Sequence, residues 1–285
     1  MEETQELKKH FPNFPLRKFS HSRKALAIPV TFLILFVSTL GLISVTYYFA
    51  VEKVNARSQT LKILTAKQDL ISLDENIMSI LWQPGSARMF EIADSSGKLN
   101  VQPFNNSLTV SITDNGDIDE TVFNETTGQI TYELPYSESP ETGLFLKGDS
   151  RTLTNQSGGL ITQLYIRNGA EHPEILLRYR PILSYTTAGT EDNRAVNNLR
   201  IYVLNLNTSD SIALYGEFPL RISCESTQIT TKTYTLSYSP EALLVTSALD
   251  GTSGQVSIPI SSTAEGAIIN VEVVQCNIKV KRSVM

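Results

Sequence analysis

The hydrophobic pattern of the chain opens with an unbroken apolar run. Residues 25–51 hold no charged side chain over 27 positions. A helix of that length is about 40 Å long, which exceeds the roughly 30 Å hydrocarbon core of a bilayer. The run therefore predicts a single transmembrane helix. The alternatives are a buried helix of a soluble core and a removable secretory signal, whose apolar region is only about 7–15 residues long.

After the apolar run, hydrophobic residues recur every three or four positions. This spacing is typical of one face of an amphipathic helix. A proline and a glycine at 84 and 85 then end the helical pattern, because proline cannot continue the hydrogen-bond ladder. We expect one continuous helix over residues 26–82, apolar first and amphipathic later. The residues that define the stripe are Ile63, Ala66, Leu70, Leu73, Ile77 and Leu81.

Beyond Gly85 the hydrophobic period changes to two, which indicates strands. Turn signals such as Asp250-Gly251 separate many short runs, and this arrangement favours antiparallel sheets packed as a sandwich. The polar stretch 185–198 is predicted to be a surface loop. The predicted strands are 87–93, 98–103, 107–113, 119–124, 128–134, 160–167, 174–182, 199–206, 211–217, 220–224, 228–238, 243–249, 255–261 and 267–280.

These patterns predict an α+β chain with a long N-terminal helix followed by a large antiparallel β-rich region. The helix combines a membrane span with an amphipathic stalk. The expected divisions are a cytoplasmic basic leader at 1–24, a transmembrane helix at 25–51, a stalk helix at 52–85 and an extracellular β-rich domain at 86–285.

Charge sets the expected orientation of the helix in the membrane. Residues 1–24 carry six basic and three acidic side chains, so they net +3, and the total of −5 leaves −8 for the rest. Basic residues stay on the cytoplasmic side of a span. We therefore expect a single-pass protein of the cell membrane with its N-terminus in the cytoplasm and its C-terminal domain outside. An acidic outer region also argues against a nucleic-acid partner, which needs a concentrated basic patch.

The two cysteines, Cys224 and Cys276, both lie in the β-rich region. Outside the cytoplasm a disulfide can form and persist. We predict a disulfide between them, with two buried free thiols as the alternative.

Catalytic motifs are missing from the sequence. His172 is the one histidine beyond the membrane segment, and it lies in a turn-like Glu-His-Pro sequence. The chain has no nucleophile elbow, phosphate-binding loop, dinucleotide fingerprint or paired-histidine metal helix. We therefore predict no catalytic residue, no enzyme activity and no cofactor.

A cluster of acidic residues at 114–120 offers oxygen ligands of the kind that calcium prefers. Its spacing does not match a helix-loop-helix calcium site. We favour a hairpin turn with solvated charges and predict no metal site, with Asp114, Asp117 and Asp119 as the weak calcium candidates.

Four asparagines stand in Asn-x-Ser/Thr sequences, where a glycan can be attached outside the cytoplasm. Chance alone gives about three such sites in a region so rich in asparagine, serine and threonine, so their number is no evidence of glycosylation. Their location in the β-rich region is compatible with it. The candidates are Asn105, Asn124, Asn155 and Asn207.

The start of the chain resembles the leader of archaeal type IV prepilins, the class III signal peptides of pilin-like surface proteins. A short basic segment ends in Arg23-Lys24 and runs through Ala25 and Leu26 into the apolar helix. The resemblance implies cleavage after Ala25, which makes Leu26 the first residue of the mature chain, with Ala27 as a second choice. It also implies membrane lipid as one partner and self-assembly, or assembly with other pilin-like subunits, through the N-terminal helix.

Two hypotheses for the function follow. The first is a non-catalytic, pilin-like structural or adhesive subunit of a filament or complex at an archaeal cell surface. The second is a permanently anchored single-pass surface protein that binds a glycan, an envelope layer or another protein. An anchored enzyme ranks third, and convergent carboxylates in a deep pocket would support it.

Overall fold

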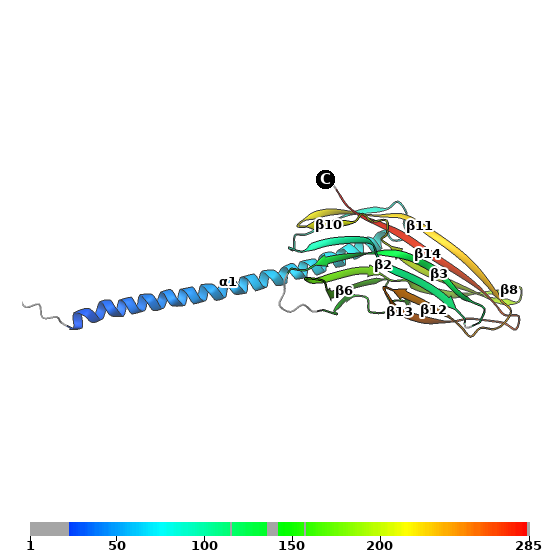
Figure 1. The fold of residues 1–285 in the computed structure, drawn as a ribbon, viewed down its shortest axis with the longest axis horizontal. Coiled ribbons are helices and arrows are strands. Elements are labelled where there is room, and N and C mark those ends of the chain that lie inside the picture. The colour runs from blue at the N-terminus through cyan, green and yellow to red at the C-terminus, as the bar shows by residue number, and fades with distance from the viewer. Residues whose placement is uncertain (1–22, 115, 136–141, 157, 284–285) are drawn as a thin grey trace, which may run out of the picture. The chain divides into compact units, whose positions relative to one another are not determined.

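The computed structural model describes residues 23–114, 116–135, 142–156 and 158–283, with backbone alone at 23–27 (Figure 1). The chain divides into two compact units, Met1–Ala56 and Arg57–Met285. One helix, α1 (Arg23–Ile80), contributes to both units. The strands all belong to the second unit.

Within the first unit α1 is free of charged residues over 25–51, and its side chains from Ile28 onward are exposed. Several hydroxyls on this segment donate hydrogen bonds to carbonyls of the preceding turn: Ser38 and Thr39 to Leu35, and Ser44 to Leu40. A hydroxyl satisfied in this way does not require water. The helix is long and apolar enough to cross a membrane, as the apolar run predicted.

The described residues of the second unit form fourteen strands. The turn predicted at Asp250-Gly251 is present, and both of its residues have positive φ. The strands are β1 (Ala87–Ile92), β2 (Lys98–Thr113), β3 (Asp119–Glu133), β4 (Phe145–Lys147), β5 (Thr154–Asn155), β6 (Thr162–Asn168), β7 (Pro173–Tyr179), β8 (Ile182–Glu191), β9 (Arg194–Asn205), β10 (Ile212–Tyr215), β11 (Phe218–Leu236), β12 (Ala242–Leu249), β13 (Thr252–Pro259) and β14 (Ala267–Arg282).

These strands form two sheets. The first has the order β1-β11-β14-β9-β8-β5, and the second has the order β13-β12-β2-β3-β7-β6-β4, with β10 paired to β2. Neighbouring strands are antiparallel except for β14 with β9 and β5 with β8. The predicted α+β class with a large, mainly antiparallel β-region is therefore confirmed.

The C-terminal part of α1 is a core element of the second unit. Ala66, Leu70, Leu73 and Ile77 are fully buried, and they belong to one apolar cluster with residues of both sheets. This is the stripe that the three-and-four spacing predicted. A second apolar cluster lies away from the helix and joins β2 and β12 to β9 and β14, through residues such as Val110 and Val271.

The predicted surface loop at 185–198 is wrong. Residues 182–191 and 194–205 form the β8–β9 hairpin, and its turn at Asp192-Asn193 has positive φ at both positions. Such a two-residue turn matches the twist of the flanking strands. The loop was predicted because β8 carries polar side chains from residue 184 on, most of them exposed on both of its faces. A strand that buries neither face loses the period-two signal.

Candidate binding groove

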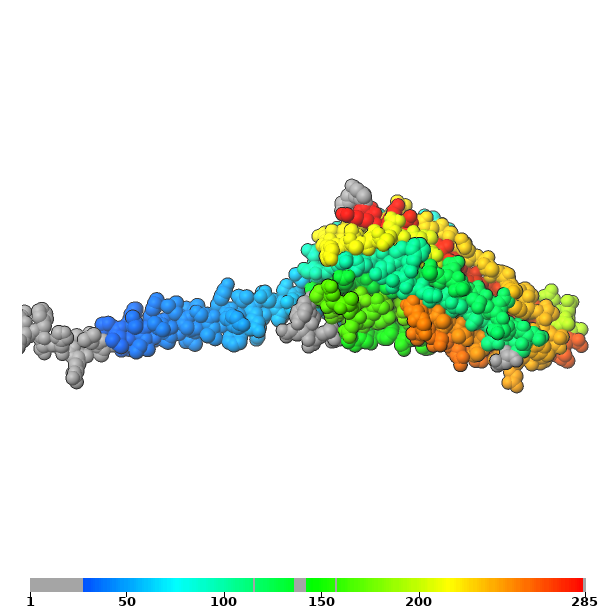
Figure 2. All heavy atoms as spheres, viewed as in Figure 1, coloured from blue at the N-terminus to red at the C-terminus, as the bar shows by residue number. Residues whose placement is uncertain are grey.

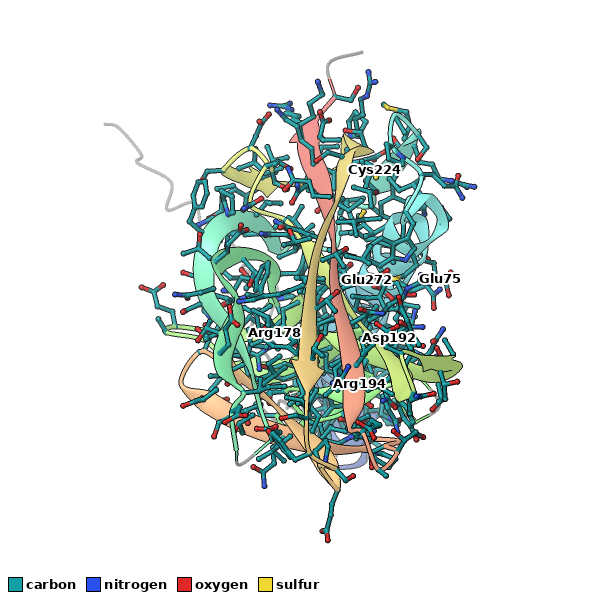
Figure 3. The ribbon with its side chains drawn as sticks, turned by 90° about the vertical axis from the view of Figure 1, so that its right-hand side faces the viewer. Glu75, Arg178, Asp192, Arg194, Cys224 and Glu272 are labelled. Atoms are coloured by element: carbon teal, nitrogen blue, oxygen red, sulfur yellow. The ribbon has the colours of Figure 1, made fainter. Side chains whose placement is uncertain are left out.

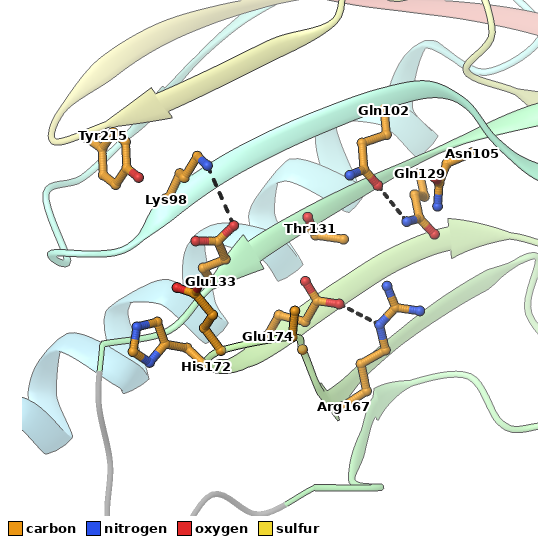
Figure 4. Close-up of a pocket in the computed structure, with 13 residues that line it drawn as sticks. Lys98, Gln102, Asn105, Gln129, Thr131, Glu133, Arg167, His172, Glu174 and Tyr215 are labelled. Carbon is orange, nitrogen blue, oxygen red and sulfur yellow. Dashed lines mark hydrogen bonds and ion pairs between the residues drawn. The ribbon is translucent and has the colours of Figure 1, made fainter.

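A polar groove of about 530 Å³ lies on the second sheet (Figure 4). Its floor consists of neighbouring strands, with Lys98 and Gln102 on β2, Gln129 and Glu133 on β3, and Glu174 on β7. These residues share a face because polar positions on β2 alternate with the buried Leu99 and Val101. In the space-filling view β2 and β3 face the reader, with β10 in yellow beside them (Figure 2).

Two ion pairs neutralise most of the charge in the groove. Lys98 Nζ lies 3.7 Å from Glu133 Oε1, and Arg167 Nε lies 2.6 Å from Glu174 Oε1. Glu133 and Glu174 are directly paired across β3 and β7. Two like charges in such positions repel each other, so each requires its own cation. A ligand that carries a large net charge would have to break these pairs.

The side-chain amides of Gln102 and Gln129 lie at the end of the groove away from Lys98, and one of their oxygens accepts no hydrogen bond. Gln129 Nε2 donates to Gln102 Oε1 at 2.7 Å, whereas Gln129 Oε1 has no partner. The Gln129 side chain is only 1% exposed. Leaving a buried acceptor unpaired costs about 1–3 kcal/mol. This oxygen is closed off from solvent, so a ligand in the groove reaches it only if the Gln129 side chain moves.

An aromatic ring borders the opposite end of the groove. Tyr215 on β10 is 70% exposed, and Lys98 Nζ lies 5.6 Å from the centre of its ring. His172 lies at the same end, in the β6–β7 turn, where its carbonyl accepts from Gly169 N–H. An exposed ring beside amides and neutralised charges suits a hydroxyl-rich, uncharged ligand that stacks on the ring and exchanges hydrogen bonds with the floor.

The groove residues were not singled out in the sequence. Their only sequence signal is the polar face of residues 98–102 and 129–133, and nothing local shows that these strands are neighbours. His172 does border the groove, but no hydrogen bond joins its ring to a serine, cysteine or carboxylate among the described residues. A nucleophile–base pair requires such a contact.

The acidic turn that offered calcium candidates is organised by hydrogen bonds within the protein. Asp114 accepts from the N–H groups of Gly116 and Ile118 through Oδ1, and the Tyr238 hydroxyl donates to its other oxygen. These contacts lower the pKa of Asp114 despite partial burial, which acts in the opposite direction. The described residues contain no cluster of three or more metal-ligating side chains around Asp117 or Asp119.

The two cysteines meet between β11 and β14. Cys224 Sγ and Cys276 Sγ are 3.4 Å apart, both are buried, and both are free thiols in the structure. A disulfide requires about 2.05 Å between the sulfurs. The structure thus brings the predicted partners together without the covalent bond, and the disulfide stays a prediction.

The predicted modification sites differ in accessibility. Asn105 and Asn124 are exposed, whereas Asn155 and Asn207 are half-buried. Asn105 lines the groove, so a glycan at that position would occupy its rim. Ala25 and Leu26 lie in the first turns of α1, where the backbone alone is described.

Comparisons with known proteins add no relative. No family model matches the chain, and it has no significant match among curated proteins or solved structures.

Proposed function

We propose that this chain is a membrane-anchored, pilin-like surface subunit, with a structural or adhesive and non-catalytic role. The supporting observation is the double use of α1: one continuous helix supplies both an exposed apolar segment and the buried face of the second unit. Such a helix is held in the folded domain at one end and can bury its apolar end in lipid or against copies of itself.

The position of Pro29 supports removal of the leader. Pro29 lies inside α1, where it removes the backbone hydrogen bond to the carbonyl of Ala25. The first four N–H groups of any helix have no partner within the helix. Cleavage after Ala25 makes Pro29 the fourth residue of the mature chain, and the proline then costs no hydrogen bond.

The experiment is mass spectrometry of the N-terminus of the protein isolated from native membranes. A chain that begins at Leu26, or at Ile28 after cleavage at the second position, is the expected result. The matched variants are Ala25→Asp and Ala27→Asp, and only the former is expected to retain the leader if Ala25 is the cleavage residue. An intact wild-type leader would overturn the pilin-like proposal and leave a permanent anchor.

The groove favours a second candidate, a permanently anchored surface protein that binds a neutral glycan. The exposed Tyr215 ring and the two ion pairs that neutralise the groove are the observations that support it. The test measures binding of uncharged oligosaccharides to the full chain in detergent. Tyr215→Ala is expected to weaken binding about tenfold, a loss of about 1.4 kcal/mol. Tyr185→Ala, an equally drastic change on β8 of the other sheet, should leave it unchanged. Equal affinity of the two variants would exclude the groove.

A further inference from the structure

Strand β11 has a long edge with no partner strand. It spans 19 residues, but β1 pairs only with its first part, from Ala87 with Ser223 to Ile92 with Phe218. Beyond a register shift at Cys224 and Ser226, β11 pairs with β14 alone, as far as Leu236 with Ala267. Figure 3 looks onto this part of the sheet, where β14 lies directly beside β11. Among the described residues, no strand pairs with the other side of 226–236, which we call the open edge.

The backbone groups of the open edge are available for pairing. Gly85 N–H donates to the Cys224 carbonyl and Cys224 N–H donates to the Ser86 carbonyl, so the polar groups of Cys224 point away from β14. Antiparallel ladders alternate inward and outward groups. With the extra residue of the bulge, the outward groups beyond it are those of Ile229, Thr231 and Thr233. This gives a row of unsatisfied donors and acceptors along a strand of about 33 Å.

Both faces of the open edge are exposed along its middle. Residues 228–233 are all exposed, and Ile229 has 64% of its surface in water. The segment is Ser-Thr-Gln-Ile-Thr-Thr-Lys-Thr-Tyr-Thr-Leu, with no proline or glycine. Its β-branched residues favour strand pairing, and threonines that face one another across a pair of strands can form hydrogen bonds. Edges of this kind are templates for another strand.

Charge indicates which partner fits. The chain beyond residue 24 nets −8, so two copies repel each other over most of their surface. The open edge carries no acidic residue, and its one charge is Lys232. Lys232 Nζ contacts the Glu120 carboxylate of the same chain, which neutralises it. The edge is therefore a strip where a second copy can approach without like-charge repulsion.

The open edge of β8, on the far side of the same sheet, is less suited to pairing. Beyond its two-residue contact with β5, β8 is interrupted by a register shift between Thr187 and Thr190, with Gly189 at positive φ, and it ends at Glu191. Bulges and charges are the devices by which proteins protect sheet edges. The open edge of β11 has a continuous register with β14 from Ser226 onward.

We propose that residues 226–236 pair edge to edge with the same segment of a second copy of this chain, joining two sheets into one. This contact goes beyond the proposed function and does not depend on leader cleavage, because it lies in the β-strands and not in the apolar helix. An experiment can therefore find an intact leader together with this contact, or a cleaved leader without it, and the two proposals fail independently.

The test is cysteine crosslinking of the full-length chain in membranes. Ile229→Cys, Thr231→Cys and Thr233→Cys are compared with Ser257→Cys, an exposed position on β13. Oxidation is expected to give at least tenfold more disulfide-linked homodimer at one or more β11 positions than at residue 257. Two copies that present the same edge to each other with matching faces pair antiparallel about a two-fold axis, so dimers are expected only at the position nearest to that axis. No excess over the control, or crosslinks only to a different protein, would overturn the proposal.

A backbone variant tests whether the edge itself makes the contact. Thr231→Pro removes one outward N–H without touching the bonds to β14, and edge strands accept proline at such positions. Thr231→Val keeps the N–H and the β-branched shape. In the Ile229→Cys or the Thr233→Cys background, whichever gives more homodimer, proline should abolish the homodimer and valine should retain it. If proline disturbs folding, as judged by circular dichroism, Thr231→Glu replaces it, because paired carboxylates repel. A dimer that survives both changes would contradict the proposal.

Discussion

At the scale of single residues, Asp74 holds α1 in register with the strands. Its carboxylate is fully buried and accepts from Lys147 Nζ at 2.5 Å, Thr162 Oγ1 at 2.9 Å and the Tyr179 hydroxyl at 3.1 Å. Burial and the Asp74 charge raise the pKa of Tyr179 well above its usual value, so the phenol keeps the proton that it donates. A helix sliding by one residue would separate all three partners from the carboxylate.

Replacing Asp74 should therefore destabilise the second unit strongly. Asp74→Asn removes the charge that compensates Lys147, and breaking a buried ion pair from one side costs about 3 kcal/mol. Urea unfolding followed by the fluorescence of Trp82, the single tryptophan, measures the change. The matched control is Glu75→Gln, since Glu75 is the next residue and is exposed (Figure 3); it should cost less than about 0.5 kcal/mol. Equal effects at both positions would contradict the role of Asp74.

The cysteine pair gives a pH dependence with a definite sign. Burial raises the pKa of Cys276 to about 12. The folded protein keeps this thiol protonated, whereas the unfolded chain ionises it above about pH 8.5. The stability that the thiol contributes is therefore complete below pH 8.5 and is lost as pH rises from there toward 12. Under reducing conditions we expect about 2 kcal/mol less free energy of unfolding at pH 10 than at pH 8.5 from this residue.

Oxidised protein serves as the comparison for this pH dependence. If Cys224 and Cys276 form the predicted disulfide, no thiol is left to titrate, and the oxidised sample should lack this loss of stability. Any pH dependence that comes from the tyrosines should be the same in both samples. Non-reducing peptide mapping shows whether the bond is present in the sample. Superimposable pH profiles of reduced and oxidised protein would contradict the assignment to Cys276.

At the scale of elements, the sequence predicted what depends on local period. The buried face of α1 was readable because Ala66, Leu70, Leu73 and Ile77 repeat at helical spacing. Strand β12 was readable because its buried and half-buried positions alternate without a break. Two predicted strands at 220–224 and 228–238 are one long strand, β11, because the bulge between them interrupts the alternation but not the pairing.

The remaining elements and the groove depend on contacts between distant segments. The polar strand β8 carries no period-two signal, and β5 is too short to carry one. The groove requires that β2, β3, β7, β6 and β10 become neighbours. Two of these pairings, β3 with β7 and β2 with β10, join strands that are not consecutive along the chain. Strand pairing over such separations follows from the global packing of the sheets, which no local pattern records.

At the scale of the whole molecule, the division at Ala56 and Arg57 leads to a test with truncated chains. The expected stalk, 52–85, does not lie apart from the β-rich region: its residues from Ala66 onward fill the core of the second unit. A chain that begins at residue 57 keeps this helix segment. A chain that begins at residue 86 loses it and exposes the apolar surfaces that the helix covers.

We therefore expect residues 57–285 to fold without the apolar segment and residues 86–285 to fail. Six side chains that α1 and its end bury would be lost in the shorter chain, the last of them Ile80 and Leu81. At about 1.5–3 kcal/mol for each of the five larger ones, excluding Ala66, their sum is comparable with the entire stability of an ordinary domain. Soluble expression, circular dichroism and cooperative urea unfolding compare the two chains. A cooperatively folded 86–285 chain would mean that the sheets are stable alone and that α1 is an appendage to them. Failure of 86–285 together with folding of 57–285 would make residues 57–80 of the helix an integral element of the second unit, without which its sheets do not fold.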